Sequence, residues 1–120
     1  MKTFRELLVW QKSMNFVTEV YKVSKLFPKE ENFGLTSQIR RSAVSIPSNI
    51  SEGYGREGLN DYLRFLNIAM SSLFELQTQL EIAFNLEYVK REKFNKLHEL
   101  SREIERMLSS FIRTLKSRKH

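Results

Sequence analysis

Residues 31–56, ENFGLTSQIRRSAVSIPSNISEGYGR, decide how the chain folds. Small and apolar side chains recur in this stretch at steps of three and four, which is the spacing of one buried face of an α-helix. These positions are Leu35, Ile39, Ser42, Ala43, Ile46, Ile50 and Gly53. The stretch therefore predicts a helix, which we expect to run from about Glu30 to Gly53.

Pro47 lies inside this helical pattern. A proline there removes a backbone donor and clashes with the carbonyl of Ala43, at a cost of about 3 kcal/mol in a helix interior. Neighbouring serine hydroxyls can bond the freed backbone groups. We therefore predict one proline-kinked helix rather than two short ones, ended by Gly53 and Gly55 through positive φ angles.

The face opposite the apolar seam is unusual for a helix that only fills a core. It carries Gln38, Arg41, Ser45, Ser48 and Glu52. Arg41 and Glu52 project in nearly the same direction, but eleven residues of helical rise place them about 16 Å apart, so each needs a partner elsewhere. Short polar side chains of this kind fit a hydrogen-bonded subunit interface. A solvated face of odd composition is the alternative.

Three further helices are predicted on either side of this segment. Thr3 and Glu6 have the spacing of a capping box, so a first helix is expected from near Phe4 to Pro28. Apolar spacing predicts a third helix from about Gly58 to Leu86 and a fourth from about Val89 to Leu115. Because the connections are short, neighbouring helices are expected to be antiparallel. The fold class is all-α: an antiparallel up-down four-helix bundle, forming a single domain over residues 1–120.

The first helix is expected to be buried on more than one side, and the third is expected to have a widened apolar seam. The first carries two apolar stripes. They are Leu7, Trp10, Met14, Val17 and Tyr21, and Phe16, Val20, Val23 and Phe27. In the third helix, a near-heptad seam is widened by further apolar residues, namely Phe65, Met70, Phe74, Ile82 and Phe84.

Composition excludes several classes of protein. The chain has no cysteine, which removes disulfides and thiolate metal sites and is compatible with a cytoplasmic location. No apolar run approaches the roughly 20 residues that a membrane span requires, and the first residues lack the core of a signal peptide, so we expect no membrane association.

The net charge of +6 is distributed unevenly along the chain. Residues 1–29 carry +4 and residues 90–120 carry +6, whereas residues 57–89 carry −4 and residues 30–56 are neutral. One interpretation is that basic outer helices flank an acidic one. The other is a basic surface that attracts nucleic acid, with an affinity that falls steeply with salt.

Enzymatic function is not predicted. A di-iron bundle requires Glu-x-x-His pairs, but position 95, three before His98, is asparagine. Two separated histidines make no zinc site, and no histidine in the segment can serve as a base for its serines. We expect His98 to be solvated on a charged helix, and we expect no catalytic residue, metal or cofactor.

Residues of the second helix are candidates for phosphate binding. Arg40 and Arg41, with Arg56 beyond the glycines, offer bidentate donors. The Gly-Tyr-Gly-Arg run at 53–56 offers backbone amides and an aromatic ring, Tyr54, that can stack on a base. The alternative is that the two glycines only end the helix and that Tyr54 is an ordinary packing residue. The candidate set for nucleic-acid binding or a subunit interface is Arg40, Arg41, Ser45, Ser48, Asn49, Glu52, Tyr54 and Arg56.

Residues typical of one known protein family span nearly the whole chain. They are Phe4 to Lys12, Tyr21, Phe27-Pro28, Gly34-Leu35-Thr36, Gln38, Arg40-Arg41, Ser45-Ile46-Pro47, Asn49-Ile50, Glu52 to Arg56, Arg64-Phe65-Leu66, Ala69, Ser72, Glu75 and Leu76. In these residues the chain resembles the small bacterial four-helix-bundle proteins named after the intervening sequence of large-subunit ribosomal RNA, some of which are labelled ribosomal proteins. Ser42 and Ser51 depart from the resemblance, since many relatives have alanine there.

The resemblance implies an assembly and a function. Family members resemble antiparallel bundles that assemble into ring-shaped homo-oligomers, and a homopentamer is the expected state. A relative, the accessory protein of diversity-generating retroelements, binds nucleic acid and a reverse transcriptase through basic surfaces. By analogy, Arg40, Arg41 and Arg56 are expected on the surface used for assembly or binding.

Two functions from different classes therefore remain. The first is a non-enzymatic, ring-like homo-oligomer that acts as a nucleic-acid-binding accessory protein for RNA or DNA. The second is a protein-interaction scaffold that docks a partner such as a reverse transcriptase and contacts nucleic acid only non-specifically.

Overall fold

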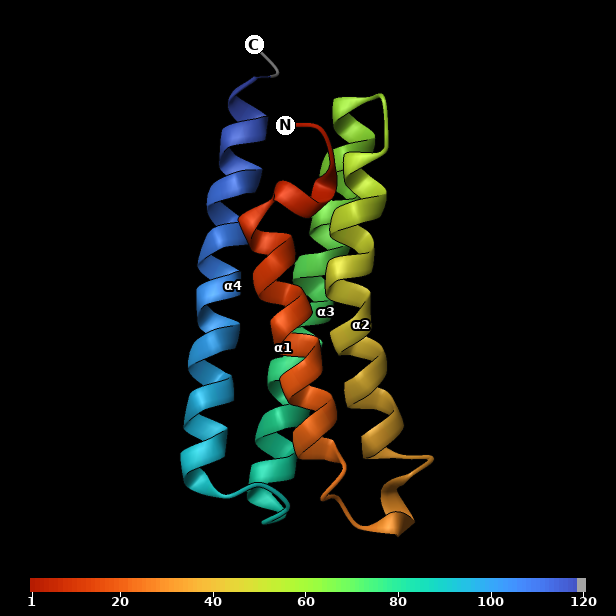
Figure 1. Cartoon of the computed structure of the whole chain (residues 1–120), viewed down its shortest axis with the longest axis vertical. Coiled ribbons are helices and arrows are strands. Elements are labelled where there is room, and N and C mark those ends of the chain that lie inside the picture. The colour runs from red at the N-terminus through yellow and green to blue at the C-terminus, as the bar shows by residue number, and fades with distance from the viewer. Residues whose placement is uncertain (119–120) are drawn as a thin grey trace.

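The computed structural model describes residues 1–118, which form a bundle of four α-helices about 49 Å long (Figure 1). The helices are α1 (Leu8–Ser24), α2 (Leu35–Tyr54), α3 (Leu59–Asn85) and α4 (Arg91–Ser117), with two 3₁₀ turns, η1 (Phe4–Glu6) and η2 (Lys29–Glu31). Each helix runs antiparallel to the next along the chain, and α1 and α3 each pack against both α2 and α4. The predicted up-down bundle is confirmed.

The first helix begins later than predicted. Oγ1 of Thr3 accepts from the backbone N–H of Arg5 at 3.1 Å, and Glu6 accepts from the backbone of Lys2 at 2.8 Å. These bonds close the short 3₁₀ turn η1, after which Leu7 adopts an extended conformation with φ −71° and ψ 119°. The α-helix therefore starts at Leu8, and the reciprocal bonds of a capping box do not form.

The second helix also starts later, at Leu35 rather than about Glu30. Glu30 and Glu31 lie in the separate turn η2, and Gly34 interrupts the helical backbone with φ −116° and ψ −115°. From Leu35 the helix continues through Pro47 to Tyr54 without a break. The prediction of one helix rather than two is confirmed, and the bend at Pro47 stays a prediction.

The glycines at the end of α2 do not adopt the positive φ angles expected of them. No glycine among residues 1–118 has a positive φ angle, and Gly55 caps the helix with φ −78°. Gly53 is instead a close-packing residue. A Cβ atom added there would lie 2.9 Å from Cδ1 of Tyr62 and 3.2 Å from its backbone oxygen, so only glycine lets α2 and α3 approach this closely.

The core lies between the four helices and follows the predicted seams. Its largest fully buried side chains include Phe16, Ile39, Ile46, Ile50, Leu66, Leu73, Leu76, Leu80, Leu97, Ile104 and Leu108. The predicted widening of the α3 seam is wrong for Phe74 and Ile82, which are exposed. In α1 the stripe from Phe16 to Phe27 is buried, whereas Met14 and Tyr21 of the other stripe are partly exposed within a single chain.

None of the helices within residues 1–118 combines the length and apolar character needed to cross a membrane.

Candidate nucleic-acid and assembly surface

The predicted surface residues fall into three groups along α2. Arg40 and Arg41 lie near its start, Ser45, Ser48 and Asn49 at its middle, and Glu52, Tyr54 and Arg56 at its end. Thirteen residues of helical rise place Arg41 about 20 Å from Tyr54, the last residue of α2, and Arg56 lies beyond that end. The two arginines therefore cannot grip one phosphate, and the three groups have different surroundings.

Arg40 holds α2 to the last turn of α1. Its Nε donates to Oγ of Ser24 at 2.8 Å, and its Nη2 donates a longer bond of 3.4 Å to the carbonyl of Tyr21. The guanidinium carbon also lies 4.6 Å from the centre of the Tyr21 ring, within cation–π range. A guanidinium has five N–H donors, so Arg40 is fixed in place with donors to spare.

Arg41 has different surroundings from its neighbour. It is exposed, and no ion-pair partner for it occurs among residues 1–118. Together with Arg40 it lines a hollow of about 730 Å³, here called the α1–α2 hollow. The lining residues are Tyr21, Asn32, Phe33, Thr36, Ser37, Arg40, Arg41 and Val44. Two cations, several polar donors and no carboxylate line this volume.

The start of α2, beside this hollow, is already occupied by a carboxylate. Oε1 of Glu31 accepts from the backbone N–H of Leu35 at 3.1 Å, which gives the first turn of α2 an acidic cap. Thr36, in the same turn, is only 5% exposed, and its Oγ1 has no hydrogen-bond partner in residues 1–118. An anion in the hollow would therefore be attracted by Arg40 and Arg41 and repelled by the Glu31 carboxylate at the start of α2.

The middle group faces α3 as much as solvent. Oγ of Ser45 lies 2.8 Å from Oγ of Ser72 on α3, and Asn49 donates to the carbonyl and the hydroxyl of Ser45 at 2.8 and 2.9 Å. Ser45 and Asn49 are thus half-buried in a contact between helices of one chain. Ser48, by contrast, is exposed.

The last group is held within the chain. Glu52 pairs with Arg56 at 3.2 Å, which corrects the expectation that Glu52 needs a partner on another helix or chain. The Arg56 guanidinium lies 4.7 Å from the centre of the Phe65 ring, and that of Arg64 lies 4.5 Å from the same ring. A positive cluster forms at this end, but the nearby carboxylates Glu52 and Asp61 partly neutralise it.

Tyr54 packs into the end of the bundle. Its ring meets Tyr62 edge-to-face, with centroids 6.4 Å apart, and its hydroxyl donates to the carbonyl of Met1 at 3.3 Å. Burial, together with neighbouring Tyr54, raises the pKa of Tyr62 to about 12, against an opposing effect of Arg118. In this arrangement the Tyr54 ring serves packing.

An apolar groove continues from the α1–α2 hollow along the same two helices. Its lining includes Trp10, Met14, Val17, Val44 and Pro47, and Val44 borders both depressions. Ser48 and Ser51 also line it. Since Met14 is 43% exposed, this face presents apolar surface that a single chain leaves uncovered.

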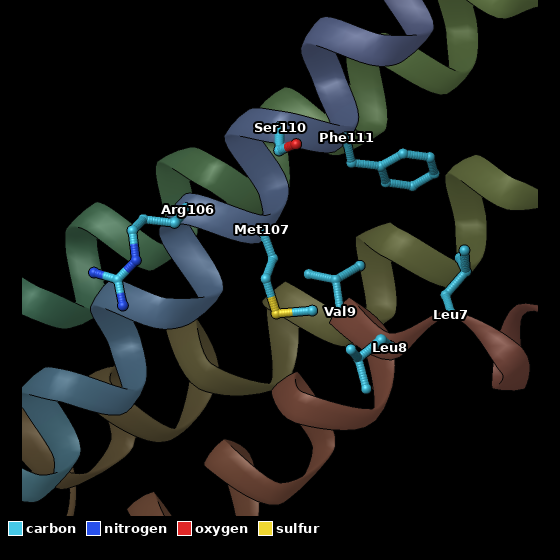
Figure 2. A pocket seen from close by; sticks show the side chains of 7 residues that line it. All are labelled: Leu7, Leu8, Val9, Arg106, Met107, Ser110 and Phe111. Atoms are coloured by element: carbon cyan, nitrogen blue, oxygen red, sulfur yellow. The ribbon is translucent and has the colours of Figure 1, made fainter.

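A further hollow of about 440 Å³ lies between the start of α1 and α4 (Figure 2). Leu7, Leu8 and Val9 line one side, and Arg106, Met107, Ser110 and Phe111 line the other. The lining holds no carboxylate or histidine to activate Ser110. The lining of this depression is therefore mainly apolar and suggests no catalytic arrangement.

The described residues also lack the elements of a metal site. No group of three or more histidine, cysteine, aspartate or glutamate side chains within residues 1–118 is arranged to hold an ion. His98 is half-buried rather than fully solvated, because its ring stacks on Phe94 with centroids 5.6 Å apart.

The sequence pattern does not identify Phe33, Asn32 and Tyr21 as surface residues of a site. Phe33 is 100% exposed and lines the α1–α2 hollow. The helical spacing places residues 30–34 in a helix, whereas they form a turn. The glycine at position 34, directly after an aromatic residue, is the signal that could have indicated a turn there.

The comparisons with known proteins agree with the architecture. The family described as 23S rRNA-intervening sequence protein matches residues 5–110. A solved structure from Bacteroides thetaiotaomicron, described as a protein of unknown function from the S23 ribosomal protein family, superposes with a TM-score of 0.81 at 32% sequence identity. The match covers 88% of this chain and 98% of that one. No curated protein matches the chain.

Proposed function

Since the chain belongs to the 23S rRNA-intervening sequence protein family, we propose that it is a non-enzymatic, homo-oligomeric accessory protein that binds nucleic acid. The family description names a stretch of ribosomal RNA rather than a reaction. The function therefore has to be argued from the surfaces of this chain.

The α1–α2 hollow is the observation that carries the proposal. It places Arg40 and Arg41 beside Asn32 and Ser37 with no carboxylate in the lining. Arginine recognises phosphate through paired N–H donors, and short polar side chains add contacts to phosphate and sugar. Two other arginine-lined hollows of the bundle differ, since Glu52 lines one of them and Glu75 the other.

The position of the arginines favours an anionic polymer over a small anion. Arg40 is fixed to α1 and supplies a constant charge, whereas Arg41 is free to follow a phosphate. Two further exposed cations, Lys25 and Lys29, lie in the connection between α1 and α2. An extended phosphate backbone can meet several of them together, which a single small anion cannot.

The apolar groove supports the homo-oligomeric part of the proposal. Partly exposed Met14 and Val44 border it together with half-buried Trp10. A subunit interface typically has an apolar core with a polar rim, and Ser48 and Ser51 supply such a rim. We propose that a second copy covers this groove and that copies close into a ring, for which a pentamer is the state that the family resemblance implies.

The alternative function, a scaffold that docks a protein partner, is favoured by a different surface. Phe74 on α3 is 48% exposed, and Ile82 on α3 and Leu86 directly after it are similarly exposed. Apolar side chains of this size on an outer helix face fit a protein partner.

Mass in solution, measured by light scattering with and without a structured RNA at low and moderate salt, tests the proposal. A ring-sized particle that gains the mass of RNA at low salt and loses it as salt rises supports the accessory function. A ring that ignores RNA at every salt concentration supports the scaffold instead. A monomer contradicts the oligomer and the assignment of the groove.

A further inference from the structure

We propose that the α1–α2 hollow selects single-stranded nucleic acid, with one unpaired base stacked on Phe33 and the adjoining phosphate bound by Arg41. This inference rests on the proposed nucleic-acid-binding function and gives it a substrate class. It follows from the exposure of one aromatic ring, the rigidity of the turn that carries it, and the charges beside it.

Phe33 is the most exposed large apolar side chain of the described residues, at 100%. A single exposed apolar residue is common on protein surfaces and needs no function. Phe33 differs because it borders a hollow that also contains two arginines, an asparagine and a serine. An aromatic face next to phosphate-binding groups is the combination that single-strand-binding proteins use.

The turn that carries Phe33 is held from both sides. Glu31, two residues earlier, accepts from the backbone of Leu35 at 3.1 Å and from the hydroxyl of Tyr88 at 3.0 Å. The backbone N–H of Gly34 also donates to the carbonyl of Glu31 at 2.9 Å. Because this backbone is already fixed, stacking a base on Phe33 orders little beyond its own side chain, which keeps the entropic cost of binding low.

The arginines define where the phosphate lies. Arg40 keeps its guanidinium over the Tyr21 ring and is tied to Ser24, so it lines the hollow as a fixed charge. Arg41, one residue further, is exposed and can approach a phosphate from solution. The start of α2 is less suitable for the phosphate, because the Glu31 carboxylate already caps it.

Base stacking requires an unpaired strand. In a duplex the faces of the bases are covered by their neighbours, so a ring on a turn reaches only the edges and the backbone. In a single strand each base offers a free face, and stacking it on an aromatic side chain strengthens binding by about tenfold. The volume of about 730 Å³ falls within the range of sites that hold small molecules, so a nucleotide has room.

The experiment compares a fluorescently labelled single-stranded oligonucleotide with its duplex by anisotropy, in low salt, on the full chain. The wild type is expected to bind the single strand about tenfold more tightly than the duplex. Phe33→Ala should remove this preference and leave the duplex affinity unchanged, whereas Phe33→Trp should keep it. In Phe33→Trp, the emission added over the wild-type Trp10 signal should be quenched by the single strand.

The control is Leu26→Ala, which truncates another apolar side chain, 78% exposed and outside the hollow. It should leave both affinities unchanged. Equal binding of single strand and duplex by the wild type, or a Phe33→Ala variant that keeps the preference, overturns this inference and leaves the proposed function standing. A wild type that binds neither probe overturns both.

Discussion

The hydroxyl of Tyr88 donates a hydrogen bond of 3.0 Å to Oε2 of Glu31, joining two loops that lie 57 positions apart in the sequence. The other oxygen of the same carboxylate caps α2 at Leu35, and the Tyr88 ring packs on Phe27 at 5.6 Å between centroids. One glutamate therefore connects the end of α3, the start of α2 and the turn that carries Phe33.

Because of this bond, the stability of the fold should decrease as pH rises in the alkaline range. The hydrogen bond to Glu31, with burial and the charges of Glu31 and Glu30 adding to it, raises the pKa of Tyr88. Because the pKa of Tyr88 is higher in the folded than in the unfolded state, neutral Tyr88 stabilises the fold. This stabilisation is fully present below the unfolded pKa of about 10 and is lost as pH rises through the folded pKa. We expect wild type to unfold at a higher temperature than Tyr88→Phe near neutral pH, with the difference shrinking above about pH 10. A difference that does not change with pH would contradict this.

Gly53 is expected to tolerate no larger side chain. A Cβ there would meet Cδ1 of Tyr62 at 2.9 Å and Cβ of Phe65 at 3.0 Å, so Gly53→Ala must push α3 away. We expect a loss of about 1 to 3 kcal/mol in unfolding free energy, measured with urea, even though alanine favours a helix. Gly55→Ala is the matched control, because its Cβ would have only ordinary contacts, the nearest at 3.6 Å. Equal stability of the two variants would refute the steric explanation.

The buried hydrogen bond from Ser42 to Gln79 should behave as a coupled pair. Oγ of Ser42 lies 2.6 Å from Oε1 of Gln79, and both side chains are buried between α2 and α3. Ser42→Ala leaves the amide oxygen without this donor, at an expected cost of about 1 to 3 kcal/mol. Adding Gln79→Leu should recover much of the loss, because no polar atom then remains unpaired. Additive losses in a double-mutant cycle would show that the two residues act independently.

Glu87 is the one described residue other than glycine with a positive φ angle, 63°. It follows α3 in a Schellman motif, in which the backbone of Tyr88 donates to Ala83 and that of Glu87 donates to Phe84. A side chain is strained in this left-handed conformation. Glu87→Gly is therefore expected to stabilise the protein by about 1 kcal/mol in urea unfolding, whereas Glu87→Ala removes the same charge without this gain. Equal effects of both changes would point to charge instead.

Helix number, order and the core seams could be predicted because they depend on local spacing. Ile39, Ile46 and Ile50 lie on one face of any helix through them, and the structure buries all three. The polar groups were harder to place. Arg40 and Ser24, or Tyr88 and Glu31, meet only after the helices pack, and spacing along one helix contains no information about such contacts.

The candidate site shows the same limit. Residues 30–34 resemble the acidic first turn of a helix, so the spacing places Phe33 in α2 rather than in the turn before it. Gly34 interrupts the helical backbone locally, and Glu31 fixes the turn by capping Leu35. Only the bond from Tyr88 to Glu31 is a tertiary contact that the spacing could not show. The sequence presents Gly53 as a helix terminator because its contact, Tyr62, lies on another helix.

The structure separates two arginines that the sequence presents as a pair. Arg40 bonds Ser24 and stacks on Tyr21, so its replacement loosens α1 from α2. A double change of Arg40 and Arg41 to glutamate therefore combines loss of binding with loss of stability. Arg41 alone is the residue whose removal tests binding.

Arg41→Glu is expected to weaken nucleic-acid binding while leaving the melting temperature and the particle mass unchanged. The side chain is exposed and has no ion-pair partner among residues 1–118, so little in the fold depends on it. If Arg41 neutralises one phosphate, the slope of log affinity against log salt should fall by about one. Arg113→Glu, an exposed cation on α4, makes the same change in net charge and is the control. Equal weakening by both variants would mean that binding follows overall charge rather than the α1–α2 hollow.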